Sequence, residues 1–330
     1  MTHSAQAAQT AFRAQLLTFN GDPAQSSNAA VFNEDGLLIV EDGHVVAAGA
    51  YAALSSQLAP GTQVQDMRDK LIVPGFIDTH IHYPQTDMIA SPAPGLLPWL
   101  DTYTFPTERR FADPAYAQDT AGFFVEELLA CGTTTALVYC TVHKESADAL
   151  FTESEARNLR MVAGKVLMDR NCPEFLRDTA QSGYDDSKEL IDRWHNRGRQ
   201  MYALTPRFAP TSTEAQLEAC GVLAREHQDV FIQSHVAENT DEVKWVADLF
   251  PRHRSYLDIY DHYGLLRRRA VYGHCIYLDD EDRRLIATAT RLSASETVAH
   301  AGTFGQNTQL AGRKRFGRDD AGSGLIMSTE

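Results

Sequence analysis

The stretch LIVPGFIDTHIHYPQ, residues 71–85, contains an apolar run that ends in two histidines, His80 and His82. The apolar residues predict a buried strand. Because alternate residues of a strand point to the same side, we expect His80 and His82 to project together while Ile81 points away. Two imidazoles on one side of a strand end suit a metal ion.

Similar apolar runs recur after this stretch and alternate with helix-like segments. They cover residues 133–142, 160–169, 201–210, 230–239 and 270–278, and a weaker one covers residues 291–300. This alternation predicts a parallel sheet covered by helices, in the α/β class. Six or seven such units favour a (β/α)8 TIM-like barrel, although the sequence alone leaves a doubly wound sheet open.

Helix punctuation supports this interpretation. Asp113 and Pro114 suit an N-cap followed by proline at the first helical position, with the helix ending at Gly132. Thr211 or Ser212 is the expected cap of the helix that begins near residue 213. No glycine-rich phosphate-binding motif follows any of the apolar runs.

The two ends of the chain differ from this middle part. Residues 1–70 read as a small N-terminal β-sandwich segment, with a hairpin turn at Asp42 and Gly43 between two apolar runs. Residues 71–300 are expected to supply barrel strands 1–7. The glycine-rich, polar stretch 301–330 is expected to be irregular.

Composition narrows the class of function. The 330 residues carry a formal net charge of −14, which argues against nucleic-acid and anionic-membrane partners, because those require a positive field. The five cysteines show no paired spacing, and reduced thiols in a cytoplasmic enzyme are the expected state. We see no secretory signal and no apolar run long enough to span a membrane.

Two later histidines also fall near the ends of predicted strands, His235 in SHVAEN and His274 in YGHC. In a barrel the carboxyl ends of the strands converge on one face, where active sites are built. Taken singly, His274 reads better as a satisfied strand residue. Glu238, three residues after His235, is placed to take a proton from a metal-activated water; a helix-start carboxylate is the compatible alternative.

The segments PGFIDTHIH, SHVAEN and YGHC resemble the amidohydrolase superfamily, and within it the guanine deaminases. The resemblance covers residues 14–300. Its most specific parts are HYPQ, which ends at Gln85, and PRFAPT, which contains Arg207 and Phe208. The resemblance implies that Gln85 and Arg207 hydrogen-bond the polar edge of a purine and that Phe208 packs on its ring.

The resemblance also implies the reaction chemistry. His80, His82 and His235 would bind one zinc ion per chain, although imidazole ligands leave other divalent metals open. His274 would stabilise the metal-bound water or the tetrahedral intermediate, and Glu238 would shuttle protons. The implied reaction is hydrolysis of guanine to xanthine and ammonia, by attack of a zinc-bound hydroxide on C2.

The chain departs from the family pattern after residue 300. The resemblance implies a further metal ligand, an aspartate at the end of an eighth strand, and residues 301–330 match no such segment. We therefore expect an incomplete barrel and impaired activity, as in a truncated or frame-shifted gene product. The alternatives are another amidohydrolase deaminase, acting on cytosine, a pterin or an s-triazine, or a non-catalytic remnant. A homodimer is possible for such a chain.

Overall fold

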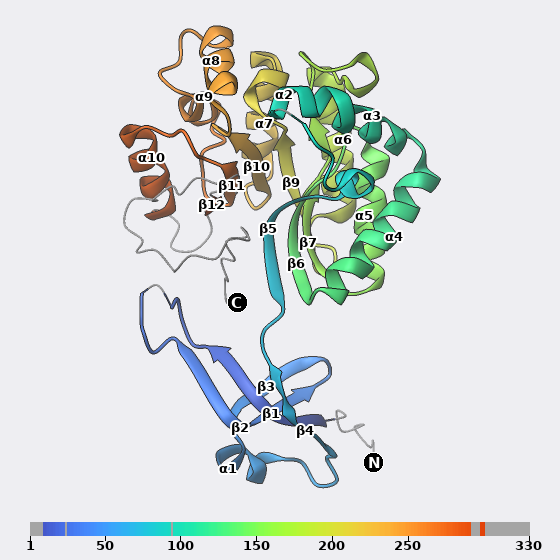
Figure 1. Ribbon diagram of the computed structural model, residues 1–330, viewed down its shortest axis with the longest axis vertical. Helices are drawn as coiled ribbons and strands as arrows, with labels where there is room; N and C mark the ends of the chain where they lie inside the picture. Colours follow the sequence, from blue (N-terminus) through green and yellow to red (C-terminus); the bar gives the residue numbers. More distant parts are fainter. Residues whose placement is uncertain (1–8, 24, 94, 292–297, 301–330) are drawn as a thin grey trace. The chain divides into compact units, whose positions relative to one another are not determined.

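The computed structural model describes residues 9–23, 25–93, 95–291 and 298–300, which form two compact units divided between Gly75 and Phe76 (Figure 1). No helix in these residues combines the length and apolar character of a transmembrane span.

The first unit is a four-stranded sheet of order β3-β2-β1-β4. Its elements are β1 (Gln9–Phe19), β2 (Ala30–Glu41), β3 (His44–Ala50), α1 (Tyr51–Leu54), η1 (Ser55–Gln57) and β4 (Val64–Ile72). The predicted hairpin is confirmed: Asp42 and Gly43 join β2 to β3 with φ of 48° and 80°, the left-handed conformation that a tight hairpin requires. The described residues of this unit form one sheet, and the second sheet of a sandwich is not among them.

The second unit is built around a parallel sheet of order β12-β11-β10-β9-β7-β6-β5, with β8 paired to β9. Its strands are β5 (Phe76–His82), β6 (Thr133–Tyr139), β7 (Arg160–Gly164), β8 (Val166–Leu167), β9 (Gln200–Pro206), β10 (Phe231–Val236), β11 (Ala270–His274) and β12 (Val298–His300). Apart from the short β8, each strand lies beside the next one in the chain, without the reversal of order that defines a doubly wound sheet. The predicted TIM-like barrel fold is therefore confirmed.

The predicted irregular tail and missing last strand fall on residues 301–330, which lie outside the described residues.

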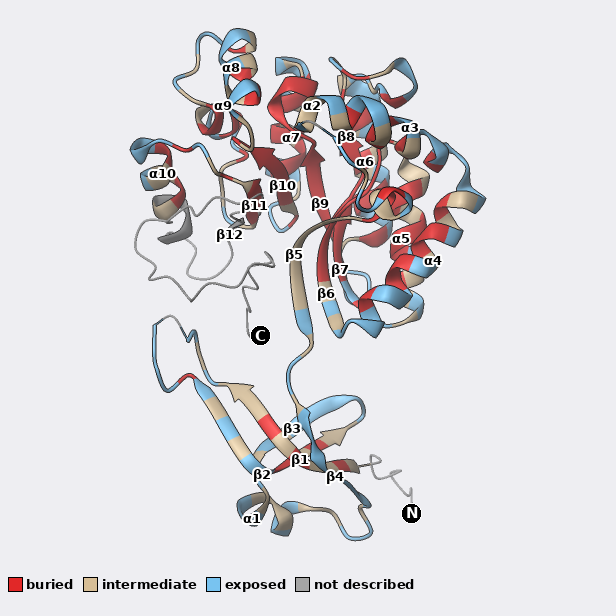
Figure 2. Cartoon of the chain, viewed as in Figure 1, coloured by how far each residue is buried: buried red, intermediate tan, exposed pale blue. Residues whose placement is uncertain are grey.

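Helices cover the outer side of this sheet, and α2 (Leu96–Trp99) and α3 (Phe105–Glu108) lie at the carboxyl ends of its strands (Figure 1). The other helices are α4 (Pro114–Ala130), α5 (Lys144–Ala156), α6 (Ala180–Trp194), α7 (Glu214–Glu226), α8 (Thr240–Leu249), α9 (Tyr256–His262) and α10 (Asp280–Arg291). Short 3-10 helices lie between these elements, namely η2 (Tyr83–Met88), η4 (Arg109–Ala112), η5 (Glu174–Leu176) and η6 (Ala209–Thr211), and α2 continues into a π-helical segment, η3 (Leu100–Thr104). The buried face of this layer is mainly aliphatic, and the central strands are buried almost throughout (Figure 2).

The predicted start and end of α4 are confirmed. The side chain of Asp113 accepts a hydrogen bond from the backbone N–H of Ala115 (2.9 Å), and Gly132 follows the helix in the left-handed conformation, with φ of 79°.

The predicted cap of α7 is wrong by one or two residues. The hydroxyl of Thr213 accepts from the N–H of Gln216 (3.2 Å), whereas Thr211 lies in η6 and donates its hydroxyl to the carbonyl of Phe208 (3.0 Å). Ser212 donates to the side chain of Gln216 (2.8 Å). Asp169 accepts hydrogen bonds from both the backbone N–H and the hydroxyl of Thr213, which fixes this residue at the start of the helix as its cap.

Candidate active site

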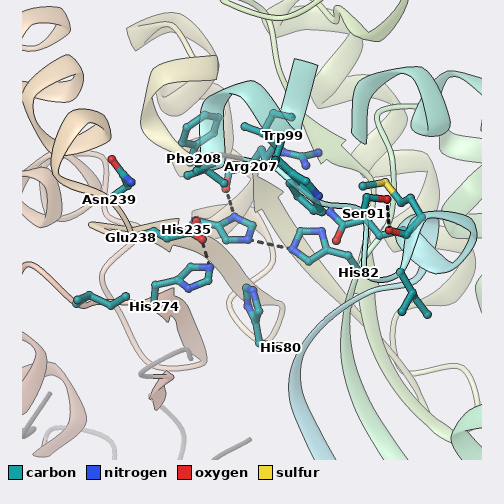
Figure 3. A pocket seen from close by; sticks show the side chains of 18 of the residues that line it. His80, His82, Ser91, Trp99, Arg207, Phe208, His235, Glu238, Asn239 and His274 are labelled. Atoms are coloured by element: carbon teal, nitrogen blue, oxygen red, sulfur yellow. Dashed lines mark hydrogen bonds and ion pairs between the residues drawn. The ribbon is translucent and has the colours of Figure 1, made fainter. Parts of the chain in front are cut away.

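A cavity of about 900 Å³ opens at the carboxyl ends of β5, β9, β10 and β11, within the size range of small-molecule sites. All the residues predicted from the sequence line it: His80, His82, Gln85, Arg207, Phe208, His235, Glu238 and His274. Figure 3 shows the four histidines gathered at one side of the cavity, with Arg207 and Phe208 beside them. The fold thus brings together residues that are up to 194 positions apart, from His80 to His274.

The first strand presents His80 and His82 to this cavity. Between Asp78 and Ile81, β5 takes three steps while the paired residues of β6 take two, which is a bulge of one residue. The rings of His80 and His82 lie 5.3 Å apart, edge to face. The ring of His80 rests on Gly273 of β11, where an added Cβ would come within 2.5 Å of the imidazole Cε1. Only glycine at this position leaves room for the His80 ring.

The ring of His235 is fixed by its neighbour on β9. Its Nδ1 lies 2.6 Å from the carbonyl oxygen of Arg207, so Nδ1 must carry the proton that it donates. Burial, together with the nearby His80, lowers the pKa of His235 well below 6.5, so the ring is neutral and Nε2 keeps a lone pair. That Nε2 lies 3.0 Å from Nε2 of His82. His235 therefore aims an unprotonated nitrogen at the other histidines.

This cluster fits a divalent cation. His80, His82 and His235 each place a ring nitrogen within 4.8 Å of the others. Two nitrogens bound at about 2.0–2.1 Å to a tetrahedral ion lie roughly 3.3 Å apart, close to the observed separation of His82 and His235. Burial lowers the pKa of His82 as well, and its Nδ1 is buried without a hydrogen-bond partner. Neutral imidazoles packed against one another are the protonation state that metal binding requires.

Glu238 lies beside this cluster because of an unusual backbone path. Ala237 and His274 both adopt the left-handed conformation, with φ of 52° and 68°, which side chains other than glycine and asparagine adopt at some strain. The carbonyl of Ala237 accepts from the N–H groups of Ile276 and Tyr277 (both 3.1 Å), which joins the ends of β10 and β11. In this arrangement Oε2 of Glu238 lies 3.3 Å from Nε2 of His274.

A second buried carboxylate supports Glu238. Glu242, in the first turn of α8, accepts hydrogen bonds from the backbone N–H groups of Glu238 (2.8 Å) and Asn239 (3.1 Å), as in a capping box. Burial, together with the negative charge of Glu242, raises the pKa of Glu238 to about 8. A carboxyl that titrates near neutral pH is suited to both accepting and returning a proton.

The lining of the cavity also carries groups suited to a flat polar ligand. Arg207 and Phe208 follow β9, and Gln85 lies in η2 after the first strand. Trp99 of α2 also lines the cavity (Figure 3). An aromatic ring, an amide and a guanidinium in the lining of one cavity provide both stacking and directional hydrogen bonds.

Three residues near the site were not predicted from the sequence. The ring of Tyr139 stacks on His82 at 4.4 Å; as the last residue of the second strand, it was accessible to the same strand-end argument that found the histidines. Trp99 and Glu108 lie in short helices between strands, where residue spacing gave no signal. Glu108 is fully buried and pairs with Arg207.

Comparison with known proteins agrees with this geometry. A guanine deaminase of Escherichia coli K12 is 49% identical over 261 residues, which cover 79% of this chain and 60% of the relative. A probable guanine deaminase of Deinococcus radiodurans is 37% identical over 308 residues, 91% of this chain and 70% of the relative. A solved structure of E. coli guanine deaminase superimposes with a TM-score of 0.82 at 44% identity, covering 86% of this chain and 66% of that one.

These relatives are longer than the part of them that this chain matches, since it spans 60% of the E. coli protein. A model of the amidohydrolase family matches residues 71–308, well over half of the sequence. The match includes every strand of the parallel sheet and every residue around the cavity. The chain therefore belongs to the amidohydrolase family.

Proposed function

We propose that this chain hydrolyses guanine to xanthine and ammonia, with one zinc ion held by His80, His82 and His235. The observation that carries the proposal is that three kinds of group line one cavity. They are three histidines spaced for a metal ion, a carboxyl with a pKa of about 8, and side chains that can stack on a ring and form hydrogen bonds with it. The similarity to guanine deaminases supports guanine as the substrate.

When bound, the metal supplies a Lewis acid that lowers the pKa of water toward neutrality. Glu238 accepts a proton from the attacking water as the water oxygen bonds to C2 of the purine. The C2=N3 π pair moves onto N3, and the same carboxyl delivers this first proton to N3. Glu238 then takes the second proton from the added oxygen and gives it to the amino nitrogen, so the C2=O bond forms, the C2–N bond breaks and ammonia leaves. His274, within hydrogen-bonding distance of Glu238, stabilises the negative charge that builds up on the attacking oxygen.

Substrate selection falls to three residues of the cavity lining. Arg207 and Gln85 hydrogen-bond the polar edge of guanine, and Phe208 packs against the ring. Adenine has a hydrogen-bond donor where guanine has its carbonyl oxygen, so it would leave buried donors of the site unpaired. Losses of this kind give discrimination on the order of 10³-fold or more.

Two further proposals concern the setting. All five cysteines are free thiols and four are buried, in keeping with a reducing cytoplasm. A homodimer is the proposed assembly, and light scattering during size-exclusion chromatography tests it.

The direct test is to purify the chain, measure its zinc content and follow guanine-to-xanthine conversion on the same sample. We expect close to one zinc per chain and turnover of guanine. Adenine, cytosine, a pterin and an s-triazine are assayed separately as alternative substrates, and guanine should be preferred. No turnover by the zinc-loaded chain, or a preference for one of the other substrates, would overturn the proposal. The same assay tests the expectation, based on residues 301–330, that turnover is impaired.

A further inference from the structure

We propose that Glu108 is a positioning residue for Arg207 and sets the charge preference of the purine site, so that the site takes neutral purines and rejects anionic ones. This inference rests on the proposed function, because it assigns a role within the same set of substrate-binding residues. It starts from a buried ion pair that the reaction itself does not use.

Glu108 reaches Arg207 from a distant part of the sequence. It is the last residue of the short helix α3, and both of its carboxylate oxygens accept from Nη1 of Arg207 at 2.9 Å. The side chains are 0% and 3% exposed, so water does not weaken this pair. A buried, charge-assisted contact of this kind fixes the guanidinium far more firmly than a surface ion pair would.

Other contacts complete the placement of Arg207. Its guanidinium carbon lies 5.6 Å from the ring centroid of Phe105, also in α3. Its own carbonyl accepts from Nδ1 of His235, so the backbone of Arg207 orients a proposed metal ligand while its side chain lines the cavity. Within the described part of the chain, Nε and Nη2 of Arg207 donate to no other residue. Glu108 thus holds one nitrogen and leaves two for a ligand.

The pair also sets the charge at the part of the cavity lined by Arg207, in addition to any charge that a bound metal ion contributes. Arg207 is the only lysine or arginine among the described residues that line the cavity, and Glu238 is the only carboxylate. Without Glu108, Arg207 would be an uncompensated cation at the edge of a low-dielectric cavity and would favour anions. With Glu108 behind it, the same guanidinium donates hydrogen bonds with its charge balanced.

Two purines of different charge test this idea at a single pH. At pH 7 hypoxanthine is neutral and urate is a monoanion, so their affinity ratio reports the charge preference of the site. Calorimetric binding of each to the zinc-loaded enzyme is independent of turnover. We expect Glu108→Gln to shift the ratio toward urate on the order of tenfold relative to wild type. Glu108→Asp, which keeps the charge, should leave the ratio within about twofold.

Matched variants separate this role from a merely structural one. Asp178→Asn removes the nearer of the two carboxylates beside the buried Lys165, at 2.6 Å, and leaves Asp186 at 3.9 Å. Because this pair lies outside the cavity lining, the ratio should not change. Arg207→Gln should shift the ratio against urate, because Glu108 is then the uncompensated charge. Adding Glu108→Gln to Arg207→Gln should restore it toward wild type. If Glu108→Gln alone does not fold, the Arg207→Gln and double variants carry the test.

The outcomes distinguish this inference from the proposed function. A folded, zinc-containing Glu108→Gln variant with an unchanged ratio, or an Arg207→Gln variant without the opposite shift, overturns the role of Glu108 alone. A wild-type chain that neither turns over guanine nor binds either purine overturns the proposed function, and this inference falls with it.

Discussion

Two regions of the second unit meet the same physical problem, the burial of ionisable groups, in opposite ways. We call them the wall, the layer where β7 and β9 pack against α5 to α7, and the mouth, the strand ends around the cavity. In the wall, Lys165 is fully buried and its ammonium lies 2.6 Å from the carboxylate of Asp178. In the mouth, Glu238 lies next to Glu242, and imidazoles face one another.

The difference teaches what each region is built for. In the wall, opposite charges compensate each other, so removal of either partner would leave the other charge buried at a large cost in stability. In the mouth, Arg207 is paired with Glu108, but the carboxyls of Glu238 and Glu242 lie together, and so do the three imidazoles proposed to bind the metal. A bound cation would compensate these like groups. The metal-free mouth should therefore lower the stability of the fold, while the wall supports it.

The largest expected effect comes from removing a proposed metal ligand. His235→Ala should lower kcat/KM for guanine about 10⁴-fold, because the several kcal/mol of charge stabilisation from a bound metal is lost. Chelation of wild-type zinc should do the same reversibly. Metal analysis and the xanthine assay on one sample check this.

The wall provides the control for this variant. Asp178→Asn should reduce the free energy of unfolding by about 3 kcal/mol, because it leaves the buried Lys165 with only the more distant carboxylate of Asp186, 3.9 Å away. Its zinc content and its rate per folded molecule should match wild type. A folded Asp178→Asn chain without zinc would contradict this comparison, because it would show that metal binding also depends on the wall.

The second effect concerns Glu238. Glu238→Gln should lower kcat about 10³-fold while zinc stays bound, because the amide neither accepts nor returns the proton. The same change should stabilise the metal-free chain at alkaline pH. Parallel measurement of kcat, zinc content and the unfolding midpoint tests the trade between rate and stability.

The pH dependence follows from the raised pKa of Glu238. In the folded metal-free chain this carboxyl keeps its proton up to about pH 8, whereas in the unfolded chain it loses it near the ordinary value of 4.5. Between these values only the folded state holds the proton, so its stabilising contribution is complete below pH 4.5 and is lost as the pH rises to 8. The slope is about 1.4 kcal/mol per pH unit. Denaturant titrations of wild type should show this added decline, and those of Glu238→Gln should not.

The third effect compares two glycines. In the mouth, Gly273→Ala would place a Cβ 2.5 Å from His80 and push that ring aside, so zinc affinity should fall about 10–100-fold with a modest change in stability. In the wall, Gly164→Ala would place a Cβ 1.8 Å from the carbonyl oxygen of Ala203, a backbone atom that cannot rotate away. That variant should lose roughly 3 kcal/mol or more of unfolding free energy yet keep its zinc when folded. Zinc titration and thermal unfolding of both variants separate the two outcomes.

How far the sequence predicts this architecture depends on how local each signal is. The strands and the four cavity histidines were predicted because apolar runs and strand-end positions are read within a few residues. Gln85, Arg207 and Phe208 came from the family resemblance, since no spacing rule brings residue 85 beside residue 207. The alternation of elements favoured the strand order of a barrel but left that of a doubly wound sheet open.

The misses have physical reasons. Glu108 was not predicted because its partner, Arg207, is 99 positions away and TFPTE gives no sign of burial. The cap of α7 was misplaced because Thr211, Ser212 and Thr213 are all competent caps, and only tertiary contacts decide which hydroxyl is available. The roles assigned to the cavity residues stay predictions until the variants are measured.

The smallest expected effect concerns backbone strain. Ala237 in the mouth and Asn158 in the wall both have left-handed φ, 52° and 56°. Asparagine tolerates this conformation, but alanine is destabilised there by about 1 kcal/mol. Ala237→Gly would remove that strain and also a buried methyl worth roughly 0.8 kcal/mol, so stability should hardly change. The rate should still fall severalfold, because glycine lets Glu238 leave its direction toward His274.

Asn158→Gly is the matched change, since it alters an exposed left-handed residue at the end of α5, outside the cavity lining. Both its unfolding midpoint and its kcat should equal wild type within about twofold in rate, because neither strain nor a reactive group depends on it. If Ala237→Gly also kept its full rate, the left-handed turn after β10 would merely join two strands. A loss of rate at unchanged stability would instead mean that the strain in the mouth serves to aim Glu238, the same exchange of stability for reactivity that its gathered carboxylates and imidazoles make.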